Sequence, residues 1–75
     1  MKLRDLIYRL SSLWDEFAIS EWDANCEDSR PLYTCYTMHE LENIVWDGHM
    51  ADWEVINIVP MIHGVHIIVK RKKHG

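Results

Sequence analysis

The chain has 75 residues, of which 48% are hydrophobic and 27% are charged, and its formal net charge is −4. These are the values of an ordinary globular domain rather than of a disordered chain, and the length leaves no room for a second domain. The longest apolar runs are far shorter than the roughly 20 residues of a membrane-spanning helix. We therefore expect one soluble, cytoplasmic domain over residues 1–75, in which residues 70–75 form a basic C-terminal tail.

Acidic and basic side chains are segregated along the sequence. Between Ser11 and Val69 there are eleven acidic side chains and a single basic one, Arg30. The other basic residues lie near the two ends of the chain, at Lys2, Arg4, Arg9, Lys70, Arg71, Lys72 and Lys73. The sequence therefore predicts an acidic body with basic ends.

The first part of the chain contains one helical pattern and one strand pattern. Apolar residues recur at helical spacing over residues 2–13, which predicts an amphipathic helix there. Over residues 17–22 the apolar side chains alternate, which predicts a first strand. Residues 23–31 contain Asn, Glu, Asp, Ser and Pro and almost nothing apolar, so we expect a loop.

A second strand and a second helix follow this loop. Residues 32–37 are aromatic and β-branched, which is typical of a strand. Thr37 and Glu40 have the spacing of a capping box, in which the Thr37 hydroxyl accepts from the Glu40 amide and the Glu40 carboxylate accepts from the Thr37 amide. A helix of about ten residues is expected to follow, with Gly48 as its C-terminal cap.

Two β-branched runs close the chain, over residues 53–60 and 65–71, and the connector between them contains Pro60 and Gly64. This pattern indicates a β-hairpin. The predicted order is helix, strand, strand, helix, strand, strand. We expect an α+β fold in which a four-stranded, mainly antiparallel sheet carries both helices on one face. The predicted core is Leu3, Leu6, Ile7, Leu10, Phe17, Ile19, Leu41, Val45, Ile56, Ile58, Val65, Ile67 and Val69.

The back face of this predicted sheet is unusually apolar. It would present Ala18, Ser20, Trp22, Val55, Asn57, Val59, His66 and Ile68. Such a surface is too apolar for one that meets only water. We expect either a loop or a partner to cover it.

Little in the sequence indicates catalysis or a cofactor. Among five histidines and two cysteines, no pair has the C-x2-C or H-x3–5-H spacing of a structural zinc site, so we expect no bound metal. Cys26 and Cys35 flank a predicted turn and could face each other, but in a reducing cytoplasm two free thiols are expected. The chain also lacks a glycine-rich phosphate loop, and we expect it not to be an enzyme.

The basic residues at positions 70–73 could bind phosphates. At the end of a strand, however, such residues more often form a solubilising fringe that also protects a sheet edge. The acidic body would repel nucleic acid. We therefore expect neither a direct nucleic-acid partner nor a membrane partner.

The acidic stretch is the strongest candidate for a binding site. Its ordinary role would be a solvated surface, and its alternative role is docking on a basic surface of another protein. Tryptophans lie among the charges, and aromatic anchors inside a charged rim are typical of binding hot spots. The candidate partner-binding residues are the carboxylates Asp15, Glu16, Glu21, Asp23, Glu27 and Asp28 and the aromatic anchors Trp22, Trp46 and Trp53.

The order of the predicted core segments resembles that of a known group of small proteins. A helix with the sequence MKLRDLI is followed by the strands FAIS and LYT, by a helix that starts near Glu40, and by the strands VINIVP and IIV. This layout spans the whole chain and is similar to that of small accessory proteins of phages and integrated mobile elements of Gram-positive bacteria. Those groups include the anti-CRISPR proteins.

The resemblance implies a non-enzymatic protein that acts in the cytoplasm of a bacterial host. We expect it to bind and occlude a host protein that has a basic surface. In its most specific form, this hypothesis is anti-CRISPR inhibition of a Cas nuclease. The first alternative is a structural homodimer formed through the apolar back face of the sheet, and the second is a metal-dependent enzyme.

Overall fold

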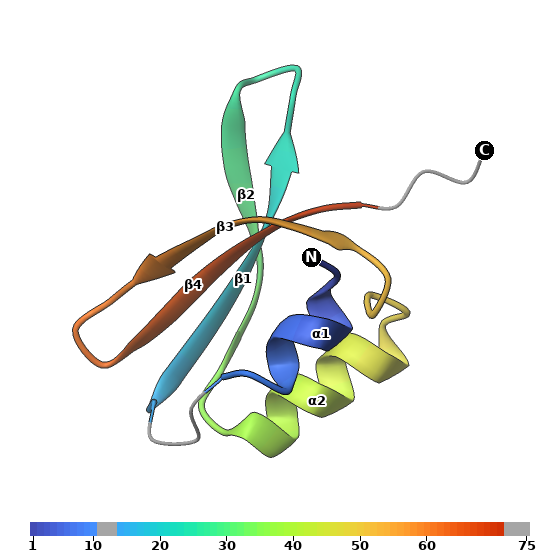
Figure 1. Ribbon diagram of the computed structural model, residues 1–75. Coiled ribbons are helices and arrows are strands. Elements are labelled where there is room, and N and C mark those ends of the chain that lie inside the picture. The colour runs from blue at the N-terminus through green and yellow to red at the C-terminus, as the bar shows by residue number, and fades with distance from the viewer. Residues whose placement is uncertain (11–13, 72–75) are drawn as a thin grey trace.

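The computed structural model describes residues 1–10 and 14–71. Its elements are α1 (Leu3–Ile7), β1 (Glu16–Asp23), β2 (Asp28–Cys35), α2 (Met38–Asp47), β3 (Glu54–Pro60) and β4 (Gly64–Lys70). The strands form one sheet in the order β2-β1-β4-β3, in which β1 and β4 are parallel and the other two pairings are antiparallel. Both helices pack on the same face of this sheet (Figure 1), so the predicted α+β fold is confirmed.

The hydrophobic core lies between the two helices and the two central strands. Removal of its apolar area from water, at about 25 cal/mol per Å², is the main favourable term for folding. The sequence did not place Cys35 and Met50 in this core, but both are buried. The buried apolar residues are Leu3, Leu6, Ile7, Phe17, Ile19, Cys35, Leu41, Val45, Met50, Val65, Ile67 and Val69.

The first helix is shorter than predicted. It ends at Ile7, and the next two backbone hydrogen bonds, from Arg9 and Leu10, reach back only three residues, as in a turn. The side chain of Lys2 does not cap the start of the helix. A single uncapped turn is only marginally stable, so packing against the core must hold it. Residues 11–13, the end of the predicted helix, lie outside the described residues.

The loop predicted over residues 23–31 is mostly strand. The turn occupies only residues 24–27, and β2 begins at Asp28 because residues 28–31 pair with the end of β1. Pairing between strands therefore overrides the polar composition of this segment. Pro31 is tolerated because β2 is an outer strand of the sheet, where a missing N–H does not break the ladder.

The predicted cap of the second helix is confirmed with one correction. The Thr37 hydroxyl accepts a hydrogen bond of 3.1 Å from the Glu40 amide, as expected. The Glu40 carboxylate, however, accepts from the amide of Tyr36 at 3.2 Å and not from that of Thr37. At the other end the Gly48 amide donates to the Ile44 carbonyl, which closes the helix.

A β-bulge in β3 changes which side chains face the core. The register of β3 against β4 shifts between Val55 and Asn57, so Ile56 is an additional residue. The prediction that Ile56 and Ile58 are core residues is wrong, because both are exposed. Val55 packs against the core instead of lying on the back face. Ile58 lies opposite the buried Ile67, in a hairpin that extends beyond the helices (Figure 1).

Candidate functional site

The six candidate carboxylates do not form one patch. Asp15 and Glu16 lie at the start of β1, where the Asp15 amide donates to the carbonyl of His63 at 2.9 Å. Asp23, Glu27 and Asp28 lie at the opposite end of this strand, beside the β1–β2 turn. A strand of this length separates the two groups by about 23 Å. These five carboxylates therefore lie in two separate groups, and Glu21 lies between the groups along β1.

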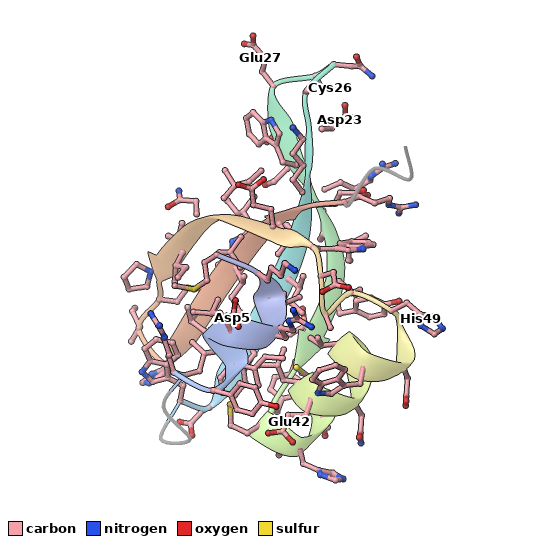
Figure 2. The ribbon with its side chains drawn as sticks, turned by 45° about the vertical axis from the view of Figure 1, so that its right-hand side comes forward. Asp5, Asp23, Cys26, Glu27, Glu42 and His49 are labelled. Atoms are coloured by element: carbon pink, nitrogen blue, oxygen red, sulfur yellow. The ribbon has the colours of Figure 1, made fainter. Side chains whose placement is uncertain are left out.

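The end of the β1–β2 hairpin, residues 23–28, is termed the acidic tip. Figure 2 shows Asp23, Cys26 and Glu27 together at the far end of this hairpin, away from the helices. The Asp23 carboxylate accepts a hydrogen bond from the Asn25 amide at 2.9 Å, and the Asp28 carboxylate accepts one from the Ser29 amide at 2.8 Å. Glu27 has a φ of 51°, in the left-handed region that a tight turn requires.

Among residues 1–10 and 14–71, no basic side chain forms an ion pair with the acidic tip. None of the ion pairs formed by the described residues involves Asp23, Glu27 or Asp28. The carboxylates of Asp23 and Asp28 accept hydrogen bonds from nearby backbone amides. A partner can therefore use the negative charge of the tip without first breaking an ion pair to another described residue.

Glu21, in contrast, is already paired. Its side chain is 12% exposed and lies 3.7 Å from Arg30 and 3.0 Å from Arg71. The Arg71 guanidinium also lies over the ring of Trp53, 5.0 Å from the ring centroid. Glu21 and Trp53 therefore belong to a cluster that joins β1 to the end of β4 and to the segment before β3. This cluster was not predicted, because fifty residues separate Glu21 from Arg71 in the sequence.

The three tryptophans lie in different places. Trp22 is half-buried, next to the acidic tip, on the sheet face opposite the helices. Trp46 is exposed on the outer side of α2, and Trp53 packs against the core beneath Arg71. Of the three predicted anchors, the structure brings only Trp22 together with the carboxylates of the tip.

The basic ends of the chain meet in one groove, which the sequence did not predict. A shallow groove of about 710 Å³ is lined by Met1, Lys2, Arg4, Asp5, Asp52, Glu54, Lys70 and Arg71. The Asp52 carboxylate lies 3.7 Å from Lys2 and 3.5 Å from Arg4. Glu54 pairs across the strands with Lys2 on one side and with Lys70 on the other. This alternation of charges does not favour the binding of phosphates. Lys70, the first residue of the predicted tail, is the last residue of β4.

The described histidines and cysteines do not gather into a metal site. Residues 1–10 and 14–71 contain no group of three or more His, Cys, Asp or Glu side chains that could hold a metal ion. Both cysteines are free, with Cys26 exposed in the acidic tip and Cys35 buried. Burial, with a smaller contribution from the Glu40 carboxylate, raises the pKa of the Cys35 thiol from 9.0 to about 11. A thiol with this pKa is a poor nucleophile.

One serine–histidine pair resembles a nucleophile and its base. The Ser20 hydroxyl lies 2.6 Å from Nε2 of His66, across the parallel pairing of β1 and β4. Ser20 is only 2% exposed, so a substrate cannot reach its hydroxyl in this conformation. The pair instead satisfies two polar groups of the sheet.

The comparisons with known proteins give no match: no family model, no curated protein and no solved structure is significantly similar to the chain. In the described part of the chain, no helix has the length and apolar character needed to cross a membrane. The candidate site is therefore defined by the structure alone. It is the acidic tip with Trp22 at its base.

Proposed function

We propose that this protein acts by binding, and that its acidic tip docks on a basic surface of a host protein and occludes it. The observation that supports this proposal is the absence of an internal base at the tip, among the described residues, in contrast to the paired Glu21. Unpaired surface charge raises the rate of association with an oppositely charged surface. It also selects against acidic partners.

The shape of the tip suits occlusion. The hairpin that carries it is only two strands wide and extends beyond the helices (Figure 1). Such an element can enter a groove that a nucleic-acid backbone would otherwise occupy, with Trp22 packing against the rim. Inhibition of a Cas nuclease is the most specific form of this proposal, because anti-CRISPR proteins are one group among the small accessory proteins whose layout the sequence resembles. In this form the protein belongs to a phage or mobile element and is not an enzyme.

The test compares two variants in a pull-down from bacterial lysate at low salt, with identification of the retained proteins. In D23N/E27K/D28N, Asn side chains keep the turn hydrogen bonds while the net charge of residues 23–28 changes from −3 to +1. The matched control, E42K/D47K, changes the net charge by the same amount on the outside of α2, far from the tip (Figure 2 labels Glu42).

We expect the wild type and the E42K/D47K control to retain the same basic or nucleic-acid-binding protein. The tip variant should bind it at least about tenfold more weakly, a loss of about 1.4 kcal/mol. Equal retention by both variants would show that the tip is not the binding element. If the retained protein is a nuclease, its cleavage of DNA should be inhibited by the wild type and not by the tip variant.

A further inference from the structure

The sheet face opposite the helices is not covered by any helix or strand of residues 1–10 and 14–71 (Figure 1). We term it the open sheet face. It differs from the back face expected from the sequence only in Val55, which the bulge turns toward the core. The open sheet face consists of Ala18, Ser20 and Trp22 of β1, Asn57 and Val59 of β3, and His66 and Ile68 of β4.

Two polar contacts on this face are made within the molecule. The Ser20 hydroxyl and Nε2 of His66 are 2.6 Å apart and satisfy each other. The Asn57 carbonyl oxygen accepts a hydrogen bond from the backbone amide of Ile58 at 2.9 Å. Burial of an unpaired polar group costs roughly 1–3 kcal/mol, and these pairings reduce that cost. These two contacts therefore lower the cost of dehydrating the open sheet face.

The outer edge of β3 does not favour the addition of another strand. The Val55 amide donates to the Met1 carbonyl at 2.7 Å, and the Ile58 amide is used by Asn57. Pro60 has no amide hydrogen. These three positions lie on the side of β3 away from β4, as the alternation of an antiparallel pair requires. A partner therefore has to pack on the face of the sheet rather than extend its edge.

The charge distribution allows a second copy to pack there. No Asp, Glu, Lys or Arg occurs between Val55 and Val69, and the β2 residues that pair with this part of β1, Ser29, Pro31 and Thr34, are also uncharged. Two copies that each carry a net charge of −4 can approach on this face without bringing carboxylates together.

The size of the molecule sets how much of the face is needed. The principal dimensions are 36, 23 and 18 Å. A stable interface buries about 800 Å² on each partner, which is close to the whole area of the largest side of the molecule. A dimer must therefore use the full open sheet face, together with the exposed Met61 and Ile62 at the end of the β3–β4 hairpin.

We propose that the open sheet face is the interface of a homodimer in which two copies pack sheet against sheet about a twofold axis. The small side chains Ala18 and Ser20 at its centre allow the two sheets to approach to about 10 Å, the usual spacing of packed sheets. A twofold axis uses the same surface on both copies, which this uncharged face permits. The proposal does not depend on the charge of the acidic tip. Trp22 is the one residue that the two proposals share, and a dimer that buries Trp22 leaves the carboxylates of the tip to bind the host protein.

Sedimentation equilibrium and light scattering on the purified full chain test this proposal over a wide range of concentration. We expect the wild type to have twice the mass of one chain at the higher concentrations. Ala18→Arg places a charge at the centre of the face, and Val59→Arg places one at an exposed position of β3 that contributes nothing to the core. Tyr8→Arg is the control, on an exposed residue after α1.

Both face variants should raise the dissociation constant of the dimer at least about tenfold, whereas the Tyr8→Arg control should leave it unchanged. Circular dichroism checks that each variant is folded, and Val59→Arg decides the matter if Ala18→Arg unfolds the chain. A wild type that stays monomeric at its highest soluble concentration would overturn the proposal. Dimers of Val59→Arg as stable as those of the Tyr8→Arg control would overturn it as well.

Discussion

The two hairpins of this sheet end in opposite ways. The β1–β2 hairpin ends in the acidic tip, whose carboxylates have no ion-pair partner among the described residues. The β3–β4 hairpin ends in the apolar residues Met61 and Ile62, and Ile62 is 93% exposed. Both ends extend beyond the layer of the helices (Figure 1). One sheet thus offers a charged end and an uncharged end, which suit different kinds of contact.

The outer strands of the two hairpins are nevertheless protected in the same way. β2 contains Pro31, β3 ends at Pro60, and each is an edge strand. A proline on an edge strand removes an amide that an added strand would need. The difference between the hairpin ends therefore concerns side chains and charge, and not the availability of the backbone.

The largest effect on stability is expected at Gly64, where the β3–β4 hairpin packs against the start of β1. A Cβ atom on Gly64 would lie 2.1 Å from the carbonyl oxygen of Glu16, so β1 and β4 would have to move apart. We expect Gly64→Ala to lower the free energy of unfolding by about 3 kcal/mol. Urea unfolding followed by tryptophan fluorescence measures this change. Asn25→Ala, in the acidic tip, is the control and should cost less than about 0.5 kcal/mol. If both variants lowered the free energy of unfolding equally, the two hairpin ends would not differ in packing as the structure shows.

The cysteines provide the next comparison, because one lies in the acidic tip and the other in the core. Cys26 is exposed, whereas Cys35 is 1% exposed with a pKa raised to about 11. A pKa two units higher leaves about a hundredth of the thiolate at neutral pH, and burial slows the reaction further. We expect iodoacetamide to modify Cys26 at least about a hundredfold faster than Cys35, as read by mass spectrometry. Comparable rates would show that β2 opens readily.

The same thiol makes stability depend on pH. In the unfolded chain Cys35 ionises near its ordinary pKa of 9.0, while in the folded chain it stays protonated up to about 11. Its contribution is therefore fully present below pH 9 and is lost as the pH rises through 11. The difference in free energy of unfolding between the wild type and Cys35→Ala should be constant below pH 9 and should fall between pH 9 and 11. A flat difference across this range would show that the thiol is accessible to solvent.

Local patterns in the sequence predicted much of the fold. The order of the elements, the Thr37 cap and the C-terminal hairpin each depend on neighbouring residues, whose chemistry is visible in the sequence. The bulge at Ile56 was not visible, because one additional residue in a β-branched run leaves the pattern almost unchanged. That single residue moved Ile56 out of the core and Val55 into it.

The candidate site was less predictable, because it depends on distances along the strand and across the sheet. Asp15 and Asp23 are close in sequence, but an extended strand of about 3.3 Å per residue carries them to opposite ends. Glu21 lies between them and is paired by Arg71, which the parallel pairing of β1 with β4 brings close. Only the pairing of strands reveals which carboxylates remain available to a partner.

The smallest effect on stability is expected at Ile62, at the end of the β3–β4 hairpin. Ile62 is almost fully exposed, so Ile62→Glu should change the free energy of unfolding of the monomer by less than about 0.5 kcal/mol. A larger difference in the free energy of unfolding between Ile62→Glu and the wild type would therefore show that this side chain is covered in solution. At low protein concentration the variant and the wild type should unfold at the same urea concentration. At high concentration the wild type alone should gain stability, because a dimer that buries Ile62 stabilises the folded state by mass action. A difference that is independent of concentration would mean that Ile62 packs within its own chain, and the two hairpin ends would then differ in structure as well as in charge.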